Sequence, residues 1–146
     1  MVWASGGRGR ALILSGAALF LVGLAQGVVV QSFANPRMGL SAHLAAVQSG
    51  MALMLAGIVW PGAALPPLWD RACRAATAVG MWGVWFALTL AAATGAGEAL
   101  PIAGAGFSGP AWAEPAAAAV VAASGAATLF GWAGLVAALI RAKAQA

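Results

Sequence analysis

The sequence has no tyrosine, a single histidine (His43) and a single cysteine (Cys73), and only 7% of its 146 residues are charged. A soluble globular domain is about one quarter charged, so this chain has too few charges to cover a water-facing surface. One cysteine excludes an intramolecular disulfide and argues against a thiolate metal site. We therefore expect the surroundings of most of the chain to be lipid.

The seven basic residues do not form a patch with interleaved aromatic residues, which argues against a nucleic-acid partner. They lie instead at the ends of apolar segments. Only Arg37 falls on one side of the predicted topology, together with Glu98 and Glu114. The other six fall on the opposite side: Arg8, Arg10, Arg71, Arg74, Arg141 and Lys143. The positive-inside rule then predicts that both termini are cytoplasmic.

Four apolar segments are long enough to cross a bilayer as helices, at about 1.5 Å per residue and about 30 Å of hydrocarbon. They run over about residues 11–30, 41–60, 75–96 and 115–140. No ten-residue alternation of the kind found in membrane barrels is present. The sequence predicts an all-α protein, an integral membrane four-helix bundle that forms a single transmembrane domain over residues 1–146.

The first segment follows two arginines, as a signal peptide does. However, its apolar run is about 20 residues long and no clear A-x-A site follows it. We expect it to be a retained span. Small residues recur within the spans, as at Gly23 and Gly27, and they favour close helix packing. Such surfaces also suit an oligomer interface or a slot for a planar ligand.

The role of His43 is the main functional question, because ionisable side chains inside membrane spans are costly. A proton relay would need further Asp, Glu or His residues in the spans, and there are none. Zinc would need two or three more protein ligands. A general base would need a recognisable nucleophile nearby. Haem needs only one protein nitrogen, so an axial haem ligand and a hydrogen-bonded structural histidine both remain open.

The neighbours of His43 on a helix are compatible with haem. Val47, Gly50 and Met54 continue its face, and Gly50 leaves a gap where a macrocycle can lie. Arg37 can pair with a propionate at the membrane interface. Ordinary core packing is the alternative for this stripe.

Two motifs resemble a known family. NPRMGLSAHL, residues 35–44, followed by Gly50 and Met51, resembles the second-helix motif of the bacterial hydroxylaminobenzene mutases. ALPIAGAGFSG, residues 99–109, resembles their loop between the third and fourth helices. The shorter pattern around His43 and Gly50 also resembles styrene oxide isomerase. The resemblance implies a multi-pass protein of the bacterial inner (cytoplasmic) membrane that isomerises small aromatic molecules without net redox chemistry.

For the epoxide isomerase, the resemblance implies a homotrimer that holds haem b near its subunit interfaces. The ferric iron is ligated by the histidine that matches His43, and acts as a Lewis acid. Carried over to this chain, this implies rearrangement of aryl hydroxylamines to aminophenols. The alternative is isomerisation of an aryl epoxide to an aldehyde.

The chain departs from the mutase pattern at several polar positions. The mutases read roughly HLEGVMNG where this chain reads HLAAVQSG, so Ala45 and Ala46 replace Glu and Gly, and Ser49 replaces Asn. A loop position that often holds His is Phe107 here. Ser49 remains a candidate for hydrogen bonding to the substrate. The losses also leave open a haem-binding membrane protein without enzymatic activity.

Aromatic side chains complete the candidate site. Trp82 and Trp85 in the third span, together with Phe107 in the loop, are predicted to line a pocket for a small aromatic substrate. For the two tryptophans, packing against lipid or the core is an equally good interpretation.

Overall fold

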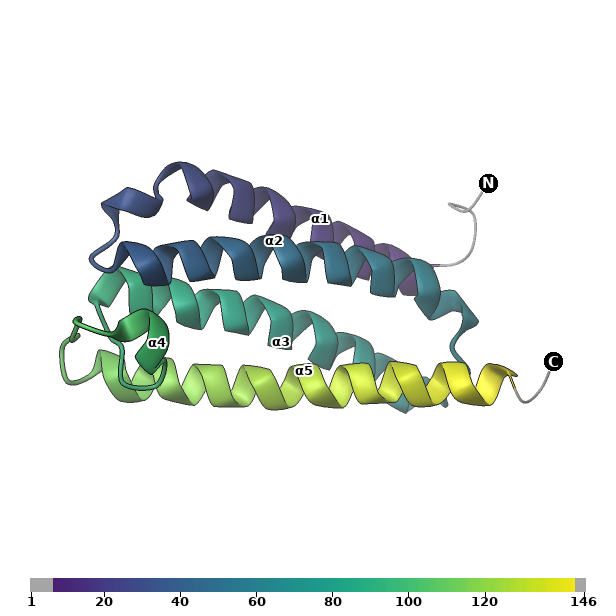
Figure 1. The fold of residues 1–146 in the computed structure, drawn as a ribbon. Helices are drawn as coiled ribbons and strands as arrows, with labels where there is room; N and C mark the ends of the chain where they lie inside the picture. Colours follow the sequence, from purple (N-terminus) through teal and green to yellow (C-terminus); the bar gives the residue numbers. More distant parts are fainter. Residues whose placement is uncertain (1–6, 144–146) are drawn as a thin grey trace.

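The chain is all-α, as predicted. In the computed structural model, which describes residues 7–143, four long helices run side by side and no strand occurs in this range (Figure 1). All four are long and apolar enough to cross a membrane. They are α1 (Gly7–Val28), α2 (Pro36–Val59), α3 (Pro67–Thr94) and α5 (Ala113–Lys143). Short elements lie between them: η2 (Val30–Ser32), η3 (Trp60–Gly62) and α4 (Pro101–Gly104).

All four long helices begin earlier than the hydropathy pattern predicts, and the difference is largest for α2 and α3. Helix α2 begins at Pro36, because the Asn35 side chain caps it by accepting a hydrogen bond from the Met38 amide at 3.1 Å. Proline at the first helical position has no amide proton to satisfy. As a result His43 lies two turns inside the helix, about 10 Å from its start.

Helix α3 begins at Pro67 and so includes charged residues that we expected to lie in a loop. Asp70 is buried, but its carboxylate accepts a hydrogen bond from Trp60 Nε1 at 2.8 Å and forms an ion pair with Arg74 at 2.9 Å. Because the charge is paired and hydrogen-bonded, it can be accommodated in the first turn of the helix.

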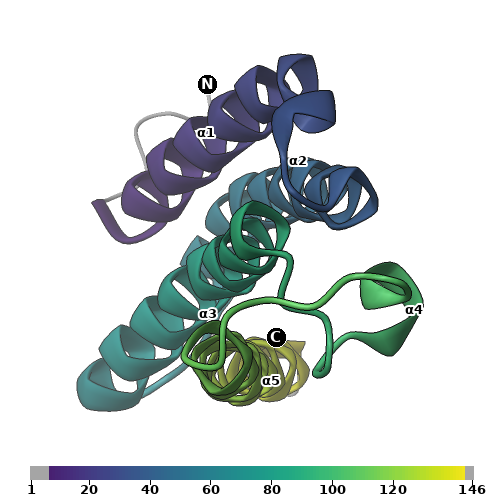
Figure 2. The same ribbon diagram turned by 90° about the vertical axis from the view of Figure 1, so that its left-hand side faces the viewer.

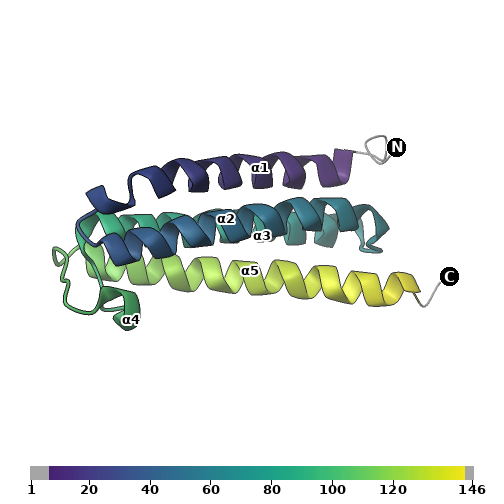
Figure 3. The same ribbon diagram turned by 45° about the horizontal axis from the view of Figure 1, so that its top comes forward.

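The helices form two antiparallel pairs. Helix α1 packs along α2, α3 packs along α5, and contacts between α2 and α3 join the pairs. Helices α1 and α5 lie at opposite edges of the molecule (Figures 2 and 3). The four helices thus form an open row. Helices α1 and α3 have few backbone contacts with each other, and they are joined mainly through side chains.

The two ends of the row differ in chemistry. Arg10, Arg71, Arg74 and Arg141 lie where α1 and α3 begin and α2 and α5 end, which we call the basic end. The opposite end carries the 29–35 and 95–112 connections and helix α4, and we call it the loop end (Figure 1). This division matches the charge asymmetry found in the sequence.

Glycines spaced seven residues apart bring α1 and α2 into backbone contact. A Cβ atom at Gly50 would lie 2.6 Å from the Phe20 amide nitrogen and 2.8 Å from the Gly16 carbonyl oxygen. Gly57 meets Gly9 in the same way one layer further toward the basic end. Small residues are the usual means of such close approach in lipid.

Large apolar side chains cover much of the outer surface. Burial within the chain covers only 17–33% of the windows that define the four spans. Side chains more than half exposed occur on all four long helices: Leu14, Leu21, Val28, Leu55, Ile58, Val79, Phe86, Leu129, Val136 and Ile140. Such a surface is stable in lipid or against other subunits, and not in water.

We expect Gly50→Ala to destabilise the fold. The added methyl group would overlap the α1 backbone, and overpacking of this kind costs about 1–3 kcal/mol. Thermal unfolding of the detergent-purified protein measures the effect as a lower Tm. Gly125→Ala is the matched control, because a Cβ atom there meets nothing within 4 Å. Equal Tm values for the two variants would contradict the proposed close packing.

Candidate functional site

His43 is held on the face of α2 that packs against α1. Its Nδ1 lies 2.7 Å from the Gly23 carbonyl oxygen, and the ring is half-buried. A Cβ atom at Gly27 would lie 2.8 Å from His43 Cε1, so glycine at that position makes room for the ring. The small-residue pair Gly23 and Gly27 therefore accommodates the imidazole.

The hydrogen bond to Gly23 determines which imidazole nitrogen is free. A carbonyl oxygen can only accept, so Nδ1 carries the proton and Nε2 of the neutral ring keeps its lone pair. Within residues 7–143, no hydrogen bond to Nε2 is present. Metal-ligating histidines commonly donate their other ring N–H to a backbone carbonyl, which fixes the ring orientation.

The described residues contain no group of three or more His, Cys, Asp or Glu side chains that could hold a metal ion. A metal at His43 would thus take its other ligands from elsewhere. Haem meets this condition, since the porphyrin supplies four nitrogens. The donor set of the described residues is compatible with haem and not with a protein-ligated zinc site.

The expected gap at Gly50 is filled, which corrects the prediction from the sequence. Val47, Gly50 and Met54 do share the face of His43, but that face is the contact with α1. A Cβ atom at Gly23 would lie 3.0 Å from Val47 Cγ2, and one at Gly16 would lie 2.8 Å from the Met54 amide. The macrocycle slot predicted beside Gly50 is therefore occupied by helix α1.

Ser49 does not join His43. Six residues along a helix place it about 240° around and about 9 Å away along the axis. It lies half-buried, on the side of α2 that includes the buried residues Leu53 and Ala56. The structure thus separates the two residues that were predicted to act together.

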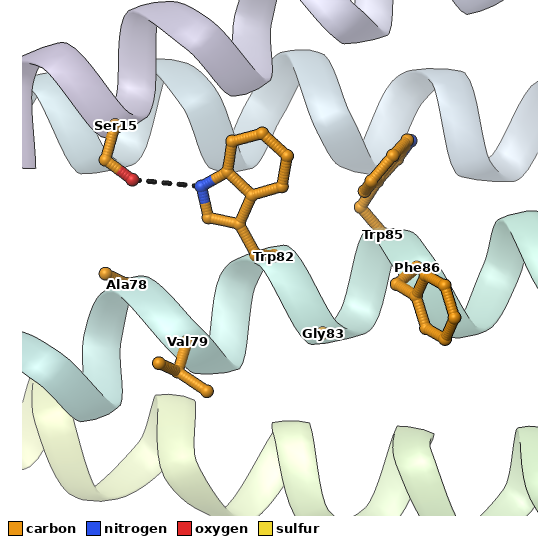
Figure 4. A pocket seen from close by; sticks show the side chains of 7 residues that line it. All are labelled: Ser15, Ala78, Val79, Trp82, Gly83, Trp85 and Phe86. Atoms are coloured by element: carbon orange, nitrogen blue, oxygen red, sulfur yellow. Dashed lines mark hydrogen bonds between the residues drawn. The ribbon is translucent and has the colours of Figure 1, made fainter.

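Trp82 and Trp85 do lie together, with ring centroids 5.5 Å apart in an edge-on arrangement. Both rise from α3 toward α1, and line a lateral groove of about 510 Å³ with Ser15 and Phe86 (Figure 4). The Trp82 Nε1 donates to Ser15 Oγ at 2.9 Å. The Trp85 Nε1 is also hydrogen-bonded, to Gln26 Oε1. Both indole N–H groups are thus satisfied, and the apolar faces of the rings remain available to an aromatic ligand.

Phe107 is not part of this groove. It lies in the loop after α4, where its ring centroid is 5.8 Å from the Arg37 Cζ. Arg37 also donates a hydrogen bond to the Ala105 carbonyl oxygen. In this structure Arg37 therefore attaches the loop to the start of α2, and its exposed position still allows a role toward an anion at the membrane interface.

Gln26 is a buried polar residue that the sequence analysis did not single out. Its Oε1 accepts a hydrogen bond from Trp85 Nε1 at 2.6 Å, and its Nε2 donates to Thr89 Oγ1 at 3.1 Å. It directly precedes Gly27, which contacts the His43 ring. A polar amide inside an apolar span was the signal in the sequence that could have identified Gln26. Its partners could not be predicted from the sequence, because they are 59 and 63 residues away.

Two further polar residues hold the loop end together. Asn35 is fully buried, and besides capping α2 it donates from Nδ2 to the Ala103 carbonyl oxygen at 2.9 Å. The Glu114 carboxylate accepts hydrogen bonds from the amides of Gly97, Glu98 and Gly109 at 3.0–3.1 Å. The Gly-rich loop is therefore an ordered part of the end of the molecule that carries His43.

Comparisons with known proteins agree on one family. A family model described as styrene oxide isomerase matches residues 8–142. Hydroxylaminobenzene mutase HabA of Ectopseudomonas oleovorans is 42% identical over 93 residues, which cover 63% of this chain and 69% of the relative. Hydroxylaminobenzene mutase HabB of the same organism is 41% identical over 103 residues, covering 70% and 63%. No solved structure matches the chain.

We expect Glu114→Gln to loosen the 97–109 loop. The amide replaces a two-oxygen acceptor by one oxygen and an NH₂ group, which cannot accept from the facing backbone amides. Hydrogen–deuterium exchange of the Gly97, Glu98 and Gly109 amides should become several-fold faster. Glu98→Gln is the control, because no hydrogen bond to its carboxylate is found among residues 7–143. Unchanged exchange in Glu114→Gln would contradict the proposed role.

Proposed function

The chain belongs to the styrene oxide isomerase family, and from this premise we propose that it is a haem b-dependent membrane isomerase that rearranges aryl hydroxylamines to aminophenols. The single observation that carries the haem assignment is the His43 imidazole, whose Nδ1–H is engaged by Gly23 while Nε2 has no partner among the described residues. The proposed substrate class, aryl hydroxylamines, comes from the names of the two mutase relatives.

His43 would hold the haem through Nε2, and the exposed Arg37 could pair with a propionate. When bound, ferric haem would supply a Lewis acid that polarises the substrate oxygen. The role of the protein is to present one nitrogen in a fixed orientation, since the Gly23 carbonyl prevents the ring from rotating.

The reaction is a rearrangement without net redox change. The N–O bond of the hydroxylamine breaks, the hydroxyl oxygen forms a bond to a ring carbon, and that carbon loses its proton, which restores the aromatic ring. The nitrogen takes up one proton and becomes the amine, so the aminophenol is an isomer of the substrate. The cationic ring formed on the way must be protected from bulk water. The apolar surroundings of the spans, with Trp82 and Trp85 facing the lateral groove, would supply this protection and a stacking surface for the ring.

The wider assembly is also a proposal. We infer a homotrimer in the bacterial inner (cytoplasmic) membrane, with both termini cytoplasmic and the haem near subunit interfaces. Support comes from the basic end and from the apolar surface around His43, where Leu40, Leu44, Leu24 and Val28 are all at least 46% exposed. A second subunit on that surface could cover the side of a haem that α1 leaves open.

Aryl epoxide isomerisation is the alternative activity, and the description of the matching family favours it. The same Lewis-acid chemistry would open the C–O bond at the benzylic carbon, and a hydride or group shift would give an aldehyde. Side-by-side assays of hydroxylaminobenzene and styrene oxide separate the two activities. Turnover of neither substrate by haem-loaded protein would instead indicate a non-enzymatic haem protein.

We expect His43→Ala to abolish both the haem absorption band and the isomerase activity, because it removes the only imidazole in the chain. The measurement is an absorption spectrum and an aminophenol assay of protein purified from a haem-supplemented host. Ser49→Ala is the control, since Ser49 lies off the histidine face, and it should keep the band. A band of full intensity in the His43→Ala variant would overturn the haem assignment.

A further inference from the structure

A second groove lies at the basic end, away from the histidine and the tryptophan pair. It has a volume of about 400 Å³ and lies between the start of α3 and the second half of α5. Its walls are apolar, and include Leu65, Pro66, Trp69, Phe130 and Gly134. The rings of Trp69 and Phe130 are 6.1 Å apart, and both are about half exposed, at 54% and 44%.

The α5 wall of this groove is a straight strip. Phe130, Gly134 and Arg141 are spaced at i, i+4 and i+11, which places them within about 40° of one another around the helix. Arg141 is about 16 Å from Phe130 along the axis, close to half of the about 30 Å hydrocarbon thickness. A groove of this length fits an acyl chain that runs from one membrane interface toward the midplane.

The charge at the end of the groove is positive. Arg141 lines the groove and is exposed, and it has no hydrogen bond or ion pair with any residue in the 7–143 range. Arg74 at the same end is already paired with Asp70. Basic side chains beside an apolar groove between helices are a known means of binding anionic lipid head groups.

We propose that this groove binds one anionic phospholipid, with its phosphate on Arg141 and an acyl chain along Trp69 and Phe130. The lipid belongs to the leaflet at the basic end, where Arg10 and Arg71 add positive potential. The inference rests on the proposed membrane insertion, and it is independent of the proposed isomerase activity.

Native mass spectrometry of the full-length, haem-loaded protein in detergent tests the proposal. Phosphatidylglycerol should bind more tightly than phosphatidylcholine, and Arg141→Gln should weaken its binding about fivefold, as expected for loss of one arginine near a membrane surface. Arg71→Gln is the matched control, because Arg71 is exposed at the same end but does not line the groove. Equal losses in the two variants would overturn the site in favour of general charge attraction.

A second variant tests the acyl-chain contact without changing charge. Ala133 is exposed on the groove wall, and Ala133→Phe fills the space without intruding into the core. Phosphatidylglycerol binding should fall in this variant, and inorganic phosphate should not compete with it in the unchanged protein. Full binding in Ala133→Phe, or displacement by inorganic phosphate, would overturn the groove as the site.

These outcomes can be separated from those of the proposed function. Both variants should keep the haem band and the isomerase activity, since neither position is near His43. A protein that stays monodisperse after detergent removal would contradict membrane insertion itself. Lost lipid selectivity with intact turnover would contradict only the lipid site.

Discussion

The close approach of α1 and α2 is the constraint on which the rest of the structure depends. Because the two backbones are close, the His43 side chain reaches the Gly23 carbonyl oxygen of the neighbouring helix, with Nδ1 at 2.7 Å. The glycine layers at Gly16–Gly50 and Gly9–Gly57 produce that approach. His43 lies seven residues before Gly50, so an imidazole takes the place of the next small residue in this spacing. The histidine is therefore oriented by the same packing that joins the two helices.

Polar groups in the apolar interior are mostly bonded to one another. Ser15 pairs with Trp82, and Gln26 joins Trp85 to Thr89, so the α1–α3 gap is held by hydrogen bonds that lipid cannot replace. The buried Thr128 hydroxyl lacks a partner among residues 7–143, but it is enclosed between α3 and α5. Nε2 of His43 also has no partner among residues 7–143, but His43 is only partly buried, and its lone pair is the one we propose to accept a ligand.

Hydropathy and charge predicted the all-α class, the number of long apolar helices and the two chemically distinct ends. They did not predict where α2 and α3 begin, because those starts depend on Asn35 as a cap and on the pairing of Asp70 with Trp60 and Arg74. Local composition gives no information about bonds between residues far apart in sequence. The roles of Gln26 and Glu114 were missed for that reason, since their partners come from other segments.

At Gly50 the helical periodicity is correct, but the stripe packs against helix α1 and not against a ligand. Periodicity identified the face that His43 shares with Val47, Gly50 and Met54, but periodicity cannot distinguish a gap for a ligand from a gap for a neighbouring helix. Helix α1 fills that gap along the stripe. A planar cofactor on Nε2 would therefore need space outside that stripe, on the side where the neighbouring Leu40 and Leu44 are exposed. Because one chain leaves that side apolar and open, a second copy of the chain is the simplest way to enclose it, and this links the ligand geometry to the proposed trimer.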